Sequence, residues 1–289
     1  MEIVTADFSL AMLRCATPLI FAALGVLLAE RVGVIHVSVE GTMLAGALAG
    51  TIGVAYWGNV WMGVLLSIIV GIVIGLILAG MYVYLPGEQV VMGFMFNFVT
   101  IGITSIIYRL TVEKTAAMLA VTPPTFFNIS SFTWVAFILV GVMWWFLFRT
   151  GPGLKIRATG EDALAAHAAG TNVARVRAVT LIIAAVLSSV GGAFLSMGWV
   201  RGFIENITFG RGYIALGAAY CGRWNPLIVL AVCLVFGAGE ALAFRVQVGA
   251  VGINPNYLFM VPYVFTILAI ALAGKGRGPA DAGKPYIRR

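Results

Sequence analysis

The chain has 289 residues, of which 61% are hydrophobic and only 10% are charged, and its mean hydropathy is +1.03. Soluble domains carry about 25% charged residues, so the composition excludes a water-soluble protein and indicates a polytopic membrane protein. The formal net charge of +7 comes mostly from residues between the apolar segments. We therefore attribute it to membrane topology and to contact with lipid, and we expect no nucleic-acid partner.

The apolar segments predict an all-α polytopic fold with about nine transmembrane helices (eight to ten). A helix that crosses about 30 Å of hydrocarbon needs roughly 20 residues. The segment at 208–222 is short for a full crossing, so a broken or tilted helix, with eight crossings and one re-entrant element, is the alternative there. The expected segments are 8–29, 39–57, 61–85, 88–109, 132–148, 178–199, 208–222, 226–246 and 257–273.

The first connection, at 30–41, has an unusual sequence for a membrane protein. Gly33 and Gly41 flank the β-branched run VIHVSV, which suits irregular, extended backbone better than a helix. Such backbone is tolerated at membrane depth only where it is buried in protein or lines a cavity. Two interpretations follow: a gate or pathway element, or a structural loop whose Glu40 pairs with an arginine or caps the next helix.

Two glycine pairs, Gly46 with Gly50 and Gly71 with Gly75, lie inside apolar segments. Small residues four apart let helix backbones approach closely in lipid. The pairs indicate either helix packing within the chain or, as the alternative, a dimerisation face.

Polar side chains inside apolar segments are costly and usually face a protein interior or a water-filled path. On this basis the candidate substrate-pathway residues are Glu40, His36, Asn97 and Glu240. The two histidines belong to no His/Cys/carboxylate cluster, so we expect no metal site. The chain also lacks the phosphate loop GxxxxGK[ST], so we expect it to bind no ATP itself.

The stretch 149–177 is the most hydrophilic part of the chain. Thr159 is the expected N-cap of a helix of about ten residues that ends at Gly170, and the acids Glu161 and Asp162 suit the positive end of its dipole. Its side chains are mostly small, which suits a helix that seats in a groove of a partner protein. A surface helix resting on the membrane is the alternative.

The distribution of lysine and arginine predicts the orientation. If 149–177 is cytoplasmic, the N-terminus lies outside, the C-terminus lies inside, and most basic residues face the cytoplasm. The tail at 274–289 is rich in Gly, Pro and charge and is expected to be disordered. The basic residues placed inside are Arg31, Arg149, Lys155, Arg157, Arg175, Arg177, Arg223, Lys275, Arg277, Lys284, Arg288 and Arg289, against Arg109, Lys114, Arg201, Arg211 and Arg245 outside.

Four stretches together resemble one family. The chain is similar to the inner-membrane permeases of the ribose and branched-chain amino acid class of ABC importers, and most similar to the branch that imports purine nucleosides with a basic membrane lipoprotein. The stretches are ERVGVIHVSVEGTMLAGALAG (30–50), EQVVMGFMFNFVTIGITSIIYR (88–109), TGPGLKIRATGEDALAAHAAGTNVARVR (150–177) and ENITFGRGYIALGAAYCGRWNPL (205–227).

The resemblance implies a single transmembrane permease domain over 1–289, in a bacterial inner (plasma) membrane, with 149–177 as its cytoplasmic coupling loop. It implies alternating-access transport of nucleosides or related small polar solutes, and no enzymatic activity in this chain. The implied partners are a cytoplasmic ABC ATPase that holds ATP and Mg, a second permease (a paralogue or a second copy), and an extracytoplasmic solute-binding lipoprotein. The residues that would dock on the ATPase are Glu161, Asp162, Leu164, His167, Ala168 and Gly170.

Three alternatives stay open from the sequence. The same class of permease could carry simple sugars or branched-chain amino acids. A secondary transporter or channel would need no ATPase, and it predicts inverted repeats and a charge relay. A membrane-embedded enzyme would need a nucleophile and a base in one constellation.

Overall fold

A computed structural model describes residues 6–85, 87–111, 123–126, 128–248 and 278–284, together with 260, 264 and 267. Within these residues, seven helices are long and apolar enough to cross a membrane, so the expected all-α polytopic fold is confirmed. The only strands there, β1 (Thr125–Phe126) and β2 (Ile129–Ser130), form one short hairpin. The long helices are α1 (Ala6–Arg31), α2 (Val39–Trp57), α3 (Val60–Ala79, continued by η1, Gly80–Tyr84), α4 (Gln89–Thr111), α5 (Ser131–Arg149), α8 (Val173–Phe194, continued by η2, Leu195–Val200) and α10 (Pro226–Val248).

One expected segment is shorter than a membrane crossing, and another lies almost wholly outside the described residues. The segment at 208–222 forms α9 (Arg211–Cys221), whose 11 residues extend about 16 Å, too short for a crossing. The broken-helix alternative therefore holds at this place. The segment at 257–273 lies outside the described residues, apart from three positions. The total number of crossings (eight to ten), like the side of the membrane that each end faces, stays a prediction.

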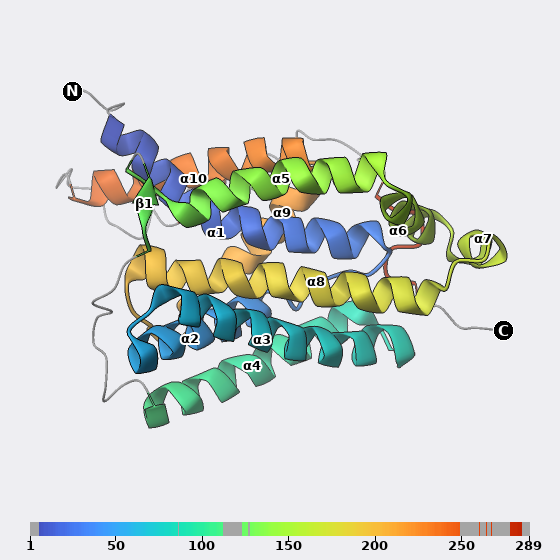
Figure 1. Ribbon diagram of the computed structural model, residues 1–289, viewed down its shortest axis with the longest axis horizontal. Coiled ribbons are helices and arrows are strands. Elements are labelled where there is room, and N and C mark those ends of the chain that lie inside the picture. Colours follow the sequence, from blue (N-terminus) through green and yellow to red (C-terminus); the bar gives the residue numbers. More distant parts are fainter. Residues whose placement is uncertain are drawn as a thin grey trace.

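The bundle is built around α1 and α8. Figure 1 shows these two helices side by side at the centre, with α5 and α10 on one side and α2, α3 and α4 on the other. Every residue of α1 from Cys15 to Glu30 is buried. In contrast, α3, α4 and α5 carry large exposed apolar side chains, among them Leu76, Phe98 and Ile138. This outward apolar surface fits a bundle in hydrocarbon and would be unsuitable in water.

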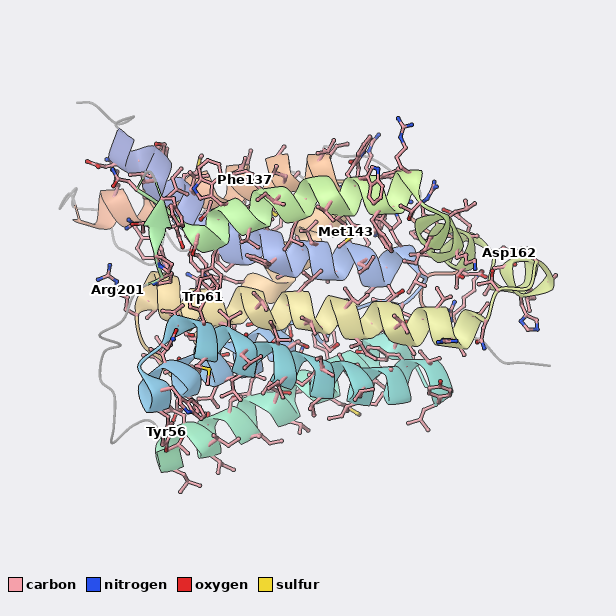
Figure 2. The ribbon with its side chains drawn as sticks, in the orientation of Figure 1. Tyr56, Trp61, Phe137, Met143, Asp162 and Arg201 are labelled. Carbon is pink, nitrogen blue, oxygen red and sulfur yellow. The ribbon has the colours of Figure 1, made fainter. Side chains whose placement is uncertain are left out.

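Aromatic side chains gather at one end of the bundle. Tyr56 and Trp61 are both more than half exposed, and Figure 2 shows them, with Arg201, at the end opposite Asp162. Exposed Trp and Tyr at a helix end are typical of a membrane–water interface. Helix α1 begins at this end, whereas α7 (Ala163–Ala168) and residues 278–284 lie at the other.

The glycine pairs pack helices within the chain. A Cβ at Gly46 would lie 2.1 Å from the carbonyl oxygen of Ser189 in α8, and one at Gly50 would lie 2.9 Å from the Cβ of Ala193. The pair at Gly71 and Gly75 meets α8 in the same way, from α3. The intramolecular interpretation is therefore correct for both pairs, since α8 occupies the surfaces that a second copy would need.

The connection at 32–38 is irregular backbone inside the bundle, as expected. The amide of Ile35 donates to Oε1 of Gln89 at the start of α4, and the carbonyl of Val37 accepts from Asn97. Asn97 lies eight residues along α4, or about 12 Å along its axis. The connection thus runs beside α4 into the bundle before α2 begins, and its residues are almost all buried.

The predicted helix at 160–170 requires correction. Thr159 is not an N-cap but a buried residue near the end of an additional helix, α6 (Gly151–Glu161). Thr150 caps α6 by accepting from the amide of Gly153 at 3.2 Å, and Pro152 lies in the first turn, where its missing N–H breaks no hydrogen bond. The sequence GPG is typical of a loop, which is why α6 was not predicted.

The second helix of this stretch is α7, with only six residues. Its N-cap is Asp162, whose Oδ1 accepts from the amide of Ala165 at 2.9 Å. Gly170 has φ +83°, and the amides of Gly170 and Thr171 bond back to His167 and Ala166. This is the left-handed glycine stop that the sequence predicts.

Residues 278–284 of the C-terminal tail are described, whereas 274–277 and 285–289 lie outside the described residues, so disorder of the tail as a whole stays a prediction. Residues 278–284 form turns, and their backbone bonds to Gly160, to Gly33 and to the buried Arg177. Composition indicates only that such a segment lacks an apolar core of its own. Here specific hydrogen bonds to other parts of the chain hold it in place.

Candidate functional site

Helix α7 projects from one end of the bundle, as Figure 2 shows at Asp162. Ala163 and Ala166 are buried against Val173 at the start of α8. This small contact is possible because both are alanines. The helix therefore rests on α8 through one face and presents the rest of its surface outward.

All six residues expected to dock on an ATPase are exposed, on α7 itself or directly beside it at the end of α6 and in the turns that flank α7. Leu164 is 68% exposed and lies between two acids and a histidine. An exposed apolar side chain at such a position can be buried in a groove of a partner protein. The docking role of Glu161, Asp162, Leu164, His167, Ala168 and Gly170 stays a prediction, and their placement is compatible with it.

A second feature lies inside the bundle, at the N-terminus of α9. The first amides of a helix have no partner within it and carry a partial positive charge. The buried carboxylate of Glu40 supplies the partner: Oε1 accepts from the amide of Gly210 at 2.8 Å and from the hydroxyl of Thr208 at 2.5 Å, and Oε2 accepts from the amide of Gly212 at 2.7 Å. Glu40 thus caps a helix, although one distant in sequence and not the next one.

Two glycines make this contact possible. Gly210 has φ +80°, a conformation that favours glycine. A Cβ at Gly212 would lie 2.7 Å from both the Cα and Oε2 of Glu40, so a larger residue there would separate α2 from α9.

Asn97 joins three elements beside the Glu40 cap. Its Oδ1 accepts from the amide of Gly41 at 2.9 Å, while its Nδ2 donates to the carbonyl of Val37 and to the hydroxyl of Tyr213, both at 3.0 Å. All of its hydrogen-bonding groups are used, and it is buried. Asn97 therefore fixes the irregular segment and α9 relative to α4.

His36 lies at the other side of this segment and is fully buried. Its Nδ1 is 3.0 Å from the hydroxyl oxygen of Ser38, which also accepts from Tyr82. Among the described residues, Nε2 of His36 has no hydrogen-bond partner. Of the four predicted pathway residues, His36 alone has a buried polar atom without a described partner.

Glu240 pairs with Arg211, the first residue of α9. The two side chains are each 13% exposed, and Nε of Arg211 lies 3.1 Å from Oε1 of Glu240, with a second contact from Nη2. Arg245, five residues further along α10, lies over the ring of Phe8 instead.

The structure therefore brings the four predicted pathway residues to one place. Glu40, Asn97 and Glu240 bond to the first turn of α9 or to the residues before it, and His36 lies on the segment that Asn97 holds. Their polar groups are engaged mainly with the protein, which favours a structural role in holding α9. Contact with a solute stays a prediction for all four.

Sequence reasoning did not find the partners of these residues. Thr208, Gly210 and Gly212 lie 168 to 172 positions from Glu40, and no local pattern links them. The available signal was the pair of glycines in TFGRGY, which lies at the start of a helix of only 11 residues.

Comparison with known proteins shows the family of this chain and several relatives. Residues 8–271 match the family described as branched-chain amino acid transport system / permease component. A putative glucose ABC transporter permease protein, TsgC13, of Haloferax volcanii is 31% identical over 85% of this chain and 79% of its own length. The guanosine ABC transporter permease protein NupQ of Bacillus subtilis is 29% identical over 94% of both chains. The nucleoside ABC transporter permease protein NupC of Lactococcus lactis is 29% identical over 96% of this chain and 95% of its own.

Proposed function

The chain belongs to the permease family of branched-chain amino acid transport systems, and on that premise we propose that it forms the translocation path for nucleosides in a binding-protein-dependent importer. It is a permease subunit of an ABC importer in the inner membrane, and not an enzyme. A subunit of this kind works with an ATPase and a solute-binding protein.

Nucleosides are the proposed cargo because two relatives that match nearly the whole chain are named for guanosine and nucleoside transport. The structure offers a feature that suits a purine base. The rings of Phe94 and Tyr213 are both partly exposed and their centroids lie 6.0 Å apart. The hydroxyl of Tyr213 accepts a hydrogen bond from Asn97, and aromatic rings of this kind can stack on any nucleobase. Simple sugars stay the second candidate, because the relative from Haloferax volcanii is named for glucose.

The proposed motor contact is the exposed surface of α7, and this surface is the observation that carries the proposal. ATP and Mg would be held by the partner ATPase, and this chain would bind no cofactor. Closure of the ATPase dimer would move α7 in both permeases of the complex and so reorient the helix bundles between outward and inward access. The second permease is a paralogue or a second copy of this chain, and an extracytoplasmic lipoprotein delivers the solute.

Uptake by the reconstituted transporter tests the cargo. The chain is assembled in proteoliposomes with its ATPase, second permease and binding protein, and labelled guanosine, glucose and leucine are offered in parallel. We expect ATP-dependent accumulation of guanosine, reduced by unlabelled adenosine but not by excess glucose. Accumulation of glucose or leucine alone would contradict the proposal that nucleosides are the cargo. Accumulation of any solute without the ATPase would contradict the assignment to ABC importers.

A further inference from the structure

Residues 278–284, here called the tail segment, bond to three parts of the chain that are far apart in sequence. The amide of Asp281 donates to the carbonyl of Gly160 at 2.9 Å, and the amide of Gly283 donates to the carbonyl of Gly33 at 3.1 Å. Arg177, which is 1% exposed, donates through Nη1 to the carbonyl of Lys284 at 3.0 Å. The tail segment thus lies between α6, the start of α8 and the turn that follows α1.

The tail segment also reaches α7 directly. Oδ2 of Asp281 accepts from the amide of Ala163, the first residue of α7, at 2.9 Å. Asp162 caps the amide of Ala165 in the same turn. A helix of six residues is too short to be stable by itself, so these two carboxylates, together with the alanine contact on Val173, decide where α7 lies.

The charge of Asp281 suits this role. Partial burial alone would raise its pKa, but the hydrogen bonds from Ala163 and Lys284 and the charge of Arg177 outweigh burial and lower the pKa below its usual value of 3.8. Because the pKa of Asp281 is lower in the folded chain than in the unfolded chain, its ionised carboxylate stabilises the contact at any pH above 3.8. This stabilisation is lost only as the pH falls through the lower, folded-state pKa. The contact is therefore fully formed at physiological pH.

The other end of the tail segment meets the connection that leads to the Glu40 cap. Gly33 and Gly283 both have positive φ, +88° and +79°. A Cβ at Gly33 would lie 3.2 Å from the carbonyl oxygen of Asp281, and one at Gly283 would lie 2.8 Å from Cδ1 of Ile35. Close approach at both glycines holds the tail segment against residues 33–35, which continue into the buried segment that carries His36.

From these contacts we propose that the tail segment is a strut between α7 and the connection after α1, which passes displacement of α7 to residues 33–38 and on to the Glu40 cap of α9. The transmission rests on the proposed docking of the ATPase on α7, whereas the strut itself is a property of this chain alone. Without the strut, α7 would move on the bundle end without moving the buried connection.

Hydrogen–deuterium exchange of the full-length chain in nanodiscs tests the strut without any partner. In Asp281→Ala, the amides of 163–168 and 33–38 should both exchange about tenfold faster, because loss of a partly buried hydrogen bond to a carboxylate shifts local opening by about that factor. Lys284→Ala is the matched control: it removes the exposed ion pair to Asp281 but keeps the bond to α7, so exchange should stay near the wild-type rate. Unchanged exchange at 163–168 in Asp281→Ala would overturn the strut.

Two further variants keep the test decisive. Faster exchange at 163–168 with unchanged exchange at 33–38 would show that the tail segment only holds α7, which contradicts transmission. If Asp281→Ala does not reach the membrane folded, Gly283→Ala loosens the other end, and exchange at 33–38 should rise; no rise would overturn the proposal.

The assembled transporter then tests coupling, through the ATP hydrolysed per solute imported. Asp281→Ala should keep the ATPase bound but raise this ratio severalfold, whereas Asp281→Asn, which retains an acceptor oxygen for Ala163, should raise it less. An unchanged ratio in Asp281→Ala would contradict transmission. Failure of the docking proposal would be seen in a different measurement: substitutions on α7 would then leave ATPase binding unchanged.

Discussion

Oε2 of Glu40 lies 2.7 Å from the backbone nitrogen of Gly212, so a carboxylate in the first turn of α2 closes the N-terminus of α9. The same carboxylate binds the amide of Gly210 and the hydroxyl of Thr208. A broken helix inside a membrane bundle leaves amides that no water can satisfy. Glu40 satisfies them with an internal anion, and α2 and α9 are thereby joined at a buried point.

Replacing Glu40 by alanine should destabilise the chain strongly. The change leaves two amides and a hydroxyl without a buried partner, and each orphaned donor costs about 1–3 kcal/mol. We expect a lower midpoint of thermal unfolding in detergent, followed by tryptophan fluorescence. Glu88→Ala is the control, because Glu88 also accepts from a helix amide, that of Val91, but is exposed. Equal midpoints for the two variants would contradict the capping role of Glu40.

Breaking the largely buried ion pair of Arg211 and Glu240 should lower the stability of the chain more than replacing both residues together. Either Arg211→Met or Glu240→Met alone leaves an uncompensated charge inside the bundle, which costs about 3–5 kcal/mol, whereas an apolar pair of similar volume is often neutral. In a double-mutant cycle of thermal midpoints, we expect the double variant to recover most of the loss. Additive losses would mean that the two charges do not depend on each other.

Gly46→Ala should force α2 away from α8. The new methyl group would lie 2.1 Å from the carbonyl oxygen of Ser189, and backbone cannot yield as a flexible side chain can, so we expect at least the 1–3 kcal/mol that is typical of overpacking. Gly141→Ala on α5 is the matched control, since no atom lies within 4 Å of its Cβ position. The thermal midpoint should fall for Gly46→Ala alone; a similar midpoint for both would contradict tight packing of α2 on α8.

The long helices could be predicted from the sequence because a membrane crossing is a local property of about 20 apolar residues. The expected 132–148 became Ser131–Arg149 and the expected 39–57 became Val39–Trp57. The irregular backbone at 32–38 was equally predictable, because the run VIHVSV differs from its surroundings in residue type. Each of these features is visible in a short window of sequence.

The arrangement of the site was not predictable in the same way. The partner of Glu40 lies on α9, the partner of Ala163 lies in the tail segment, and both contacts join positions more than a hundred residues apart. The helix α6 was missed because its start, GPG, has the composition of a loop. Thr159 was taken as the cap because its position before two acids fits the local rule, but Thr150 and Asp162 occupy the two caps instead.

Binding of the ATPase to α7 is the most direct test of the account. The chain is co-purified with its ATPase and second permease, and wild type is compared with the double variant Glu161→Arg and Leu164→Arg, which reverses a charge and buries a cation in the proposed contact. Glu205→Arg serves as the control, since Glu205 is exposed and pairs with Arg109 in a different part of the bundle. We expect the double variant to lose the ATPase and ATP-driven uptake, while the control keeps its ATPase. Full ATPase binding and uptake by the double variant would contradict docking at this surface.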